Sequence, residues 1–376
     1  MSETLPSAAI IGGSIGGLAA GICLHQIGCR ADIYERSARD LSGRGAGIVV
    51  QPQLSRLVRG IAGQHLPLTS CMTRRQIDAV TGSHSDVVMP QQFTSWEAIV
   101  QAIKGAFPAE CYHRGKTLTG FEQSEGSVTL EFGDERSVAD LAVFADGSGS
   151  YGRRRFDPDL TPEYAGYIAW RGTVAEADLP NDLQAFFHDR FTFTAAKDGG
   201  HALCYFIPGD EWRTAIGSRR LNWVWYETVE AGADLNHLLM DRDGVQQKRS
   251  ITAGMLADLP KTYLVQRAQD KLDPWFQQLI ELTEDPFIQA IEDLAVGTMA
   301  HNRVCLLGDA AFVVRPHTAG ATAKASGDAM ALADAIGRRP DNVSEALRAY
   351  EAARLPAGRS MSHLGLSLGK NSVKTR

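Results

Sequence analysis

The chain has 376 residues, of which 44% are hydrophobic, and this is enough to bury a large core in one or two closely packed domains. Its 38 basic and 44 acidic side chains give a formal net charge of −6, which offers no general attraction to nucleic acid or to an anionic membrane. We therefore expect a small-molecule partner, with no nucleic acid and no membrane.

The six cysteines are scattered without a C-x-x-C pair, a pattern that favours neither a zinc site nor a disulfide framework and is typical of the reducing cytoplasm. The histidines show no H-x-x-H or H-E-x-x-H spacing, so the sequence predicts no metal site. Residues 1–7 lack a basic n-region, and Gly12 and Gly13 interrupt the apolar run that follows. We expect neither a signal peptide nor a membrane span.

A dinucleotide-binding pattern opens the chain. Residues 8–11 predict a buried strand, residues 12–17 a glycine-rich turn and residues 18–24 a helix. In this pattern the first glycine makes the turn, the second lets the backbone approach a pyrophosphate, and the third lets the helix lie close to the strand. Ser14 takes the second position, where its hydroxyl can donate to a phosphate oxygen. The candidate cofactor-binding residues here are Gly12, Gly13, Ser14, Ile15 and Gly17.

A second strand, residues 31–35, ends in Glu35, where a carboxylate is placed to bind a ribose hydroxyl. The complete unit of strand, turn, helix and strand predicts a nucleotide site. The alternative for the glycine turn is that it only packs a helix on a sheet, and the alternative for Glu35 is a solvated acid at the end of a strand. Arg36 is a candidate adenosine contact. Arg44, in a loop of small residues, is a candidate clamp because a guanidinium matches phosphate oxygens. For both arginines the alternative is a solvated surface position.

Two later strand patterns are each followed by an acidic residue. Residues 127–132 and 141–145 predict a β-meander, and Asp146 then opens a glycine-rich loop suited to organising a cofactor crevice, although Asp-Gly after a strand is also a common turn. Residues 304–307 predict another buried strand, after which Asp309 can reach a ribityl or ribose hydroxyl. If motifs at both ends of the chain hold the same cofactor, that cofactor must be long and modular. FAD is the candidate.

Small residues precede a helix expected over residues 324–336. A helix N-terminus presents free N–H groups and a partial positive charge, which would stabilise the negative charge of a reduced isoalloxazine ring. The candidate cofactor-binding residues in this segment are Pro316, Ala319, Gly320 and Ala321.

Together these motifs resemble those of the class A flavoprotein aromatic hydroxylases, which have the para-hydroxybenzoate hydroxylase fold. The chain carries the glycine turn at 12–17, D-G-x-x-S-x-x-R at 146–153 and G-D-A-A followed by proline at 308–316. The usual family continuation G-x-G-x-N is absent, since Lys324 ends the corresponding stretch, so the role of the asparagine does not carry over. The most specific similarity is to members that hydroxylate hydroxypyridines and other N-heteroaromatic rings, and it rests on residues 167–172, 221–226, 315–317 and 323–325.

The resemblance implies an α/β fold with a discontinuous Rossmann-like FAD-binding domain and an antiparallel-sheet substrate domain. We expect the FAD-binding domain to comprise residues 1–75, 95–160 and 285–340, and the substrate domain residues 76–94 and 161–284. Residues 341–376 are expected to form a C-terminal helical segment, interrupted at 355–358, that packs on the FAD-binding domain or on a second subunit of a homodimer.

For chemistry, the resemblance implies a single-component monooxygenase in which NADH or NADPH reduces FAD and O₂ adds to form a C4a-hydroperoxide. The terminal oxygen is then transferred to a small electron-rich hydroxylated aromatic, here a hydroxypyridine. Rival interpretations are a flavin oxidase or dehydrogenase on the same scaffold and a flavin-binding protein without turnover.

Three aromatic side chains are candidates for contact with the substrate and for catalysis. His201 and Tyr226 lie in aromatic-rich segments expected to form the substrate sheet, and His317 follows Pro316, which in the family lies near the reactive face of the flavin. The alternatives are sheet packing for the first two residues and a histidine satisfied by backbone groups for the third.

Overall fold

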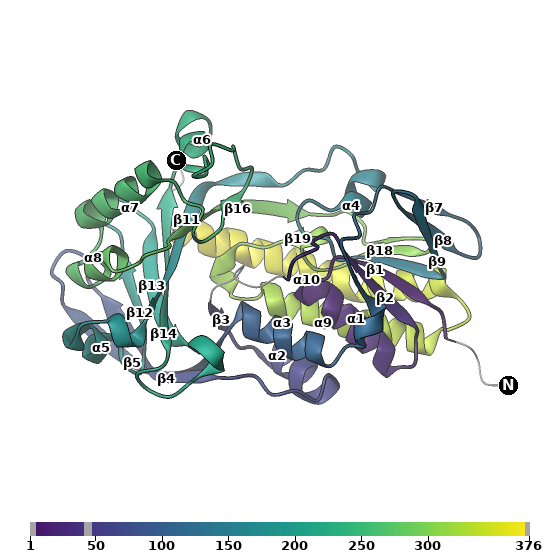
Figure 1. The fold of residues 1–376 in the computed structure, drawn as a ribbon, viewed down its shortest axis with the longest axis horizontal. Coiled ribbons are helices and arrows are strands. Elements are labelled where there is room, and N and C mark those ends of the chain that lie inside the picture. Colours follow the sequence, from purple (N-terminus) through teal and green to yellow (C-terminus); the bar gives the residue numbers. More distant parts are fainter. Residues whose placement is uncertain (1–4, 41–46, 373–376) are drawn as a thin grey trace.

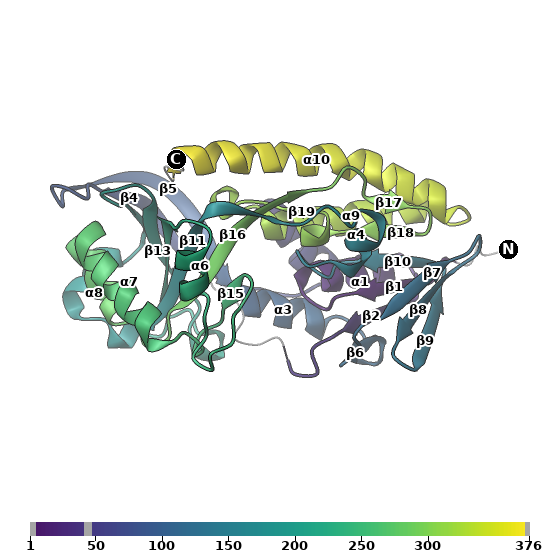
Figure 2. The same cartoon turned by 90° about the horizontal axis from the view of Figure 1, so that it is seen from above.

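The computed structural model describes residues 5–40 and 47–372. The candidate Arg44 lies outside the described residues. Figures 1 and 2 show an elongated molecule with one sheet system toward each end and the long C-terminal helix running along one side.

One of the two main sheets is built on the N-terminal strand. Its neighbouring strands run parallel, except that the edge strand β17 pairs antiparallel with β18. The three central strands β1, β10 and β18 are fully buried apolar runs, as is typical of a parallel sheet that is covered on both faces. In spatial order the strands are β17 (Ala300–His301), β18 (Val304–Leu306), β10 (Leu141–Phe144), β1 (Ala8–Ile11), β2 (Ala31–Glu35) and β6 (Tyr112–Arg114).

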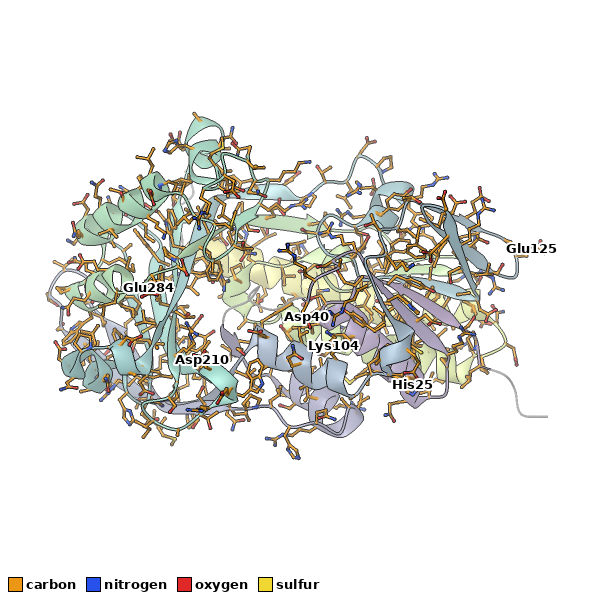
Figure 3. All side chains as sticks on the ribbon, in the orientation of Figure 1. His25, Asp40, Lys104, Glu125, Asp210 and Glu284 are labelled. Carbon is orange, nitrogen blue, oxygen red and sulfur yellow. The ribbon has the colours of Figure 1, made fainter. Side chains whose placement is uncertain are left out.

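Helices cover one face of this sheet and a small meander covers the other. On the helix side, Ile10 of β1 meets Gly17 of the first helix, and on the meander side the Phe144 ring lies 5.1 Å from the Phe121 ring, measured between centroids. Lys104 belongs to one of the helices on the helix side, and its ammonium group donates to the Asp40 carboxylate over 2.9 Å (Figure 3). The helices are α1 (Ile15–Gln26), α3 (Trp96–Gly105) and α9 (Ala321–Arg338), and the meander strands are β7 (Gly120–Gln123), β8 (Val128–Phe132) and β9 (Glu135–Ala139).

The expected meander is partly wrong. Residues 128–132 do form a meander strand, but Leu141–Phe144 form β10, a central parallel strand paired with β1 on one side and β18 on the other. The reason is burial: all four side chains of β10 are buried, as a central strand requires, whereas a meander strand shows alternating burial.

The larger sheet is mostly antiparallel, with one parallel pair between β12 and β4. Along its main path the strands are β15 (Ser250–Ile251), β16 (Phe287–Ala295), β11 (Glu163–Ala175), β14 (Arg220–Thr228), β13 (His201–Ile207), β12 (Arg190–Ala195), β4 (Thr69–Ile77), β5 (His84–Ser95) and β3 (Gly47–Val49), while β19 (Phe312–Val313) pairs with β16.

Alternation along these strands divides the larger sheet into two faces. Trp170, Trp223 and Trp225 are fully buried on one face, in a core shared with the helices α5 (Asn181–Phe187), α7 (Asp258–Lys271) and α8 (Pro274–Glu281). The intervening residues point to the opposite face, toward the smaller sheet and α9.

The expected division of the chain into domains stays a prediction, but the sheets favour different boundaries. The boundary at residue 75 falls inside β4, and β16 lies wholly in the larger sheet although residues 285–340 were assigned to the FAD-binding domain. We propose boundaries before Thr69 and after Ala295.

The C-terminal segment is one helix, α10 (Val343–Ser372), and the interruption expected at 355–358 is absent. Pro356 lies inside the helix, where it removes one backbone hydrogen bond. Packing compensates, because α10 lies against α9 and the Cα of Gly358 lies so close to the Phe312 ring that a Cβ there would approach a ring carbon to 2.4 Å. No helix within residues 5–40 and 47–372 is long and apolar enough to cross a membrane.

Candidate active site

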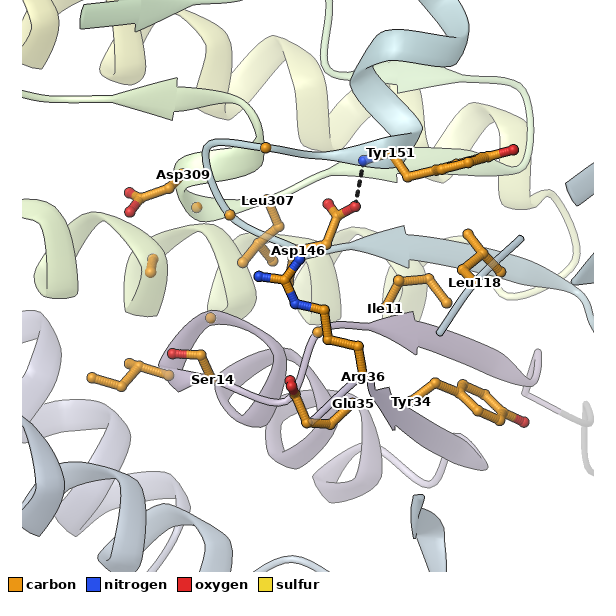
Figure 4. Close-up of a pocket in the computed structure, with 18 of the residues that line it drawn as sticks. Ile11, Ser14, Tyr34, Glu35, Arg36, Leu118, Asp146, Tyr151, Leu307 and Asp309 are labelled. Carbon is orange, nitrogen blue, oxygen red and sulfur yellow. Dashed lines mark hydrogen bonds between the residues drawn. The ribbon is translucent and has the colours of Figure 1, made fainter. Parts of the chain in front are cut away.

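A cleft of about 610 Å³ opens where four parallel strands of the smaller sheet end, and we call it the nucleotide cleft (Figure 4). Parallel α/β sheets bind ligands at this edge. Its wall includes residues that directly follow or end β1, β2, β10 and β18, among them Gly12, Glu35, Asp146 and Gly308.

The glycine turn is held by close backbone contacts. Gly12 has φ +104°, and a Cβ on Gly17 would lie 1.8 Å from the Gly12 carbonyl oxygen, so only glycine fits at both positions. Gly12, Ser14 and Ile15 line the cleft. Gly13 is instead a packing position, because a Cβ there would lie 2.2 Å from the Tyr112 hydroxyl.

Glu35 is buried and organises the turn. Its carboxylate accepts hydrogen bonds from the backbone N–H of Gly13 and of Ser37, each at 2.8 Å, so it is not a solvated strand-end acid. A carboxylate has lone pairs for about four donors, which leaves capacity for a ribose hydroxyl. Arg36 also lines the cleft (Figure 4).

Asp146 carries an unused buried acceptor. One carboxylate oxygen accepts from the Tyr151 N–H at 2.6 Å, while Oδ1 is buried without a partner among the described residues. Burial raises the pKa of this carboxyl above its usual value. A buried acceptor of this kind normally has a partner, and a hydroxyl-rich cofactor such as FAD fits the requirement.

Asp309 lines the cleft from the opposite wall, and buried cations fix the loop that carries it. Lys324 donates to the Gly308 carbonyl at 2.9 Å, and Arg153 of the D-G-x-x-S-x-x-R motif donates to the Ala310 carbonyl at 3.1 Å. Lys324 therefore takes a structural role at the position where the family pattern has asparagine.

A second cavity, of about 720 Å³, lies between the larger sheet and the N-terminus of α9, and we call it the aromatic cavity. Pro316, Ala319, Gly320 and Ala321 all line it, and Ala319 adopts the left-handed conformation with φ +49° just before the helix. Ala321, Thr322 and Ile48 line both the aromatic cavity and the nucleotide cleft. The first-turn amides of α9, which have no partner within the helix, thus lie where the two meet.

The three candidate aromatic residues come together in this cavity. The ring centroid of His317 lies 4.6 Å from that of Tyr226 and 5.4 Å from that of His201. Two of them are neighbours because β13 and β14 pair with His201 opposite Tyr226. His317 arrives from a separate segment, the 3₁₀ helix η6 (Pro316–Thr318).

His317 is half-buried, and its Nε2 lies 2.9 Å from the Tyr167 hydroxyl. Burial, with smaller contributions from His201 and Arg315, lowers the pKa of His317 to about 3, so the ring is neutral at physiological pH. Burial also raises the pKa of the Tyr167 and Tyr226 phenols, which therefore remain protonated. The cluster can accept a hydrogen bond at imidazole and donate from hydroxyls.

Several lining residues were not predicted. Arg171 lines the cavity from β11, and strand alternation could have placed it on the same face as Tyr226, since Ala169, two positions earlier, pairs with Tyr226. Tyr167 lies on the same face of β11 and contacts the cavity only through its bond to His317. Leu368 of α10 also lines the cavity, and no local signal connects it to residues so distant in sequence.

Comparisons with known proteins bear on both cavities. A family model described as FAD binding domain-like matches residues 164–293. The chain is 35% identical to the 2,6-dihydroxypyridine 3-monooxygenase of Paenarthrobacter nicotinovorans over 95% of this chain and 89% of that protein. The chain belongs to the FAD-dependent aromatic monooxygenases. This confirms the family and the fold class expected from sequence.

Two further relatives agree with this assignment. The solved structure of 2,6-dihydroxypyridine-3-hydroxylase from Arthrobacter nicotinovorans superposes with a TM-score of 0.92 at 33% identity, covering 99% of this chain and 94% of that one. The 6-hydroxynicotinate 3-monooxygenase of Pseudomonas fluorescens is 25% identical over 89% of this chain and 83% of that protein. The protein is an enzyme that uses FAD, with NAD(P)H as co-substrate, on a small aromatic compound and O₂. Within the described residues no group of three potential ligands could hold a metal ion.

Proposed function

We propose that this enzyme hydroxylates a small hydroxypyridine. The observation that carries the proposal is the cluster of His317, Tyr226 and His201 in a cavity that shares wall residues with the nucleotide cleft. Tyr167 supports this cluster through its bond to His317. Imidazole and phenol groups match the alternating donors and acceptors of a hydroxypyridine edge. Two relatives whose names specify a hydroxylated pyridine support the same substrate class.

When bound, FAD would carry two electrons from NAD(P)H to O₂, one atom of which enters the ring while the other leaves as water. The chain itself must bind, orient and dehydrate the substrate. Neutral His317 can accept a hydrogen bond from a ring hydroxyl. This hydrogen bond increases the negative charge on the hydroxyl oxygen and so makes the ring more electron-rich. The hydroxyl of Tyr226 can donate to a ring oxygen and so fix the ring carbon that reacts, while Tyr167 holds the His317 ring in place.

Apolar side chains complete the cavity and limit access of water. Leu203, Val224, Phe191 and Phe193 line it from the sheet, while Leu368 lines it from α10. Excluding water strengthens the polar contacts within the site and prevents reducing equivalents from being lost as peroxide.

The test measures NADH and NADPH oxidation by the FAD-loaded protein with and without 2,6-dihydroxypyridine under ¹⁸O₂, with mass analysis of the product. Stimulated oxidation with one labelled oxygen in the ring is the expected result. Oxidation of the compound with release of peroxide and no labelled product would identify an oxidase instead. The absence of stimulation by any hydroxypyridine tested would reject the substrate class.

We also propose a cytoplasmic location and a homodimer. Six cysteines, all free thiols, support the first proposal because reducing compartments preserve thiols. The second rests on the long amphipathic C-terminal segment noted in the sequence, and light scattering coupled to size exclusion tests it directly.

A further inference from the structure

Arg171 of β11 lines the aromatic cavity without a partner. No hydrogen bond or ion pair joins its guanidinium to any residue in the described part of the chain, and its Nε is buried without an acceptor. No aspartate or glutamate of the described residues lines the cavity, and the other cation there is Arg74. The cavity therefore carries an uncompensated positive charge.

The two cations differ in their surroundings. The Arg74 guanidinium lies over the Phe193 ring, 3.9 Å from its centroid, and this contact partly compensates the charge. No aromatic ring among the described residues makes such a contact with Arg171. A buried charge without a partner is costly to a folded protein, so an unpaired guanidinium facing a cavity indicates a site completed by an anionic ligand.

Arg171 and the partner of His317 lie at different positions along β11. Arg171 follows Tyr167, the hydrogen-bond partner of His317, by four positions on β11, which corresponds to about 13 Å along a strand. Its charge acts on the Tyr205 and Tyr226 hydroxyls, where it opposes the rise in pKa that burial causes. The larger sheet thus brings both neutral polar groups and a cationic group to the cavity.

We propose that Arg171 selects the anionic form of the substrate and binds its charged edge, so that the ring enters the site already deprotonated. This inference rests on the proposed function. In a 2,6-dihydroxypyridine that has lost a proton, the two ring oxygens and the ring nitrogen share the negative charge, which favours the anion over that of a simple phenol. The proton stays in bulk water, the bound anion pairs with the guanidinium, and the protein needs no base for this step.

The test compares two ligands of nearly equal shape. At pH 7.5, 2,6-dihydroxypyridine is largely anionic, whereas resorcinol has the same two hydroxyls on a benzene ring and is neutral. Each is titrated into FAD-loaded protein, and binding is followed through the flavin absorbance. The variants are Arg171→Gln, Arg171→Lys and, as a matched loss of charge outside the cavity on β14, Arg220→Gln, whose partner Asp210 is exposed.

Wild type and R220Q should bind 2,6-dihydroxypyridine more tightly than resorcinol. R171Q should weaken binding of the dihydroxypyridine by about 10- to 100-fold, the range for a lost hydrogen bond to a charged group, and change resorcinol binding by less than about threefold. R171K should retain part of the preference, because it keeps the charge but not the planar fork. R171K also provides the measurement if R171Q does not fold.

Three results would overturn the inference. If R171Q kept the wild-type preference for 2,6-dihydroxypyridine over resorcinol, the role of Arg171 would be rejected and the proposed function would remain intact. If only R171K folded, the same result in R171K would count in the same way. If R171Q lost affinity for both ligands equally and also bound FAD more weakly, the guanidinium would instead be assigned to the flavin. Wild-type protein that binds no hydroxypyridine would reject the proposed function and this inference with it.

Discussion

The low pKa of His317 makes a measurable contribution to the pH dependence of stability. In the unfolded chain this histidine takes up a proton below its ordinary pKa of 6.5, whereas the folded protein resists protonation until about pH 3. The unfolded state therefore binds more protons over this window, and stability falls as pH falls from 6.5 toward 3. Each pH unit corresponds to about 1.4 kcal/mol, so lowering the pH to 5.0 costs about 2 kcal/mol through this one residue.

The perturbation is His317→Gln, which removes the titration while keeping an amide that can reach the Tyr167 hydroxyl. The free energy of unfolding of FAD-loaded wild type and variant is measured by urea denaturation at pH 7.5 and 5.0. Other titrating groups contribute equally to both proteins and cancel in the comparison. The wild type should lose about 2 kcal/mol more than the variant between the two pH values.

His65→Gln is the matched control, because His65 is exposed, and it should keep the pH dependence of the wild type. If H317Q and wild type lost stability in parallel, His317 would not be held neutral by burial. Its proposed role as a neutral hydrogen-bond acceptor for the substrate would then fail as well.

Three further substitutions test the cofactor site. Gly17→Ala places a Cβ 1.8 Å from a backbone oxygen of the glycine turn and should give unstable, colourless protein, whereas Gly105→Ala, which meets nothing within 4 Å, should remain yellow with an unchanged Tm. Asp146→Asn should weaken FAD binding about tenfold in a flavin fluorescence titration; a change of less than twofold would exclude its orphan oxygen as a ligand. Lys324→Met breaks a buried ion pair and the bond to the Gly308 carbonyl, and should lower stability by about 3 kcal/mol in thermal denaturation, a loss that an unchanged Tm would rule out.

The strand-end motifs of the nucleotide cleft could be predicted because each depends only on residues close together in the sequence. The turn at Gly12 and the carboxylates Glu35, Asp146 and Asp309 all end or follow buried strands, and parallel strands bring their carboxyl ends to one edge. The family resemblance added the fold class and chemistry, both of which the comparisons confirm. The individual roles of these residues remain predictions.

Local pattern was insufficient where long-range packing decided the outcome. In the sequence, the short apolar run Leu141–Phe144 is compatible with the last strand of a meander. Its burial between β1 and β18 instead makes it a central strand. Pro356 reads as a helix break, yet contacts of α10 with α9 and Phe312 keep one helix continuous. Propensity is a weak prior that tertiary contacts override.

The sequence by itself determined the strand-end motifs that meet at the nucleotide cleft, since strand periodicity, glycine turns and strand-end acids act over a few residues. The tertiary structure alone decided the substrate end. It brought His317 to Tyr167 across 150 positions, placed Leu368 of the last helix in the same cavity and left Arg171 without a partner. These relations depend on sheet register and on the docking of distant segments, and no short window of sequence encodes either.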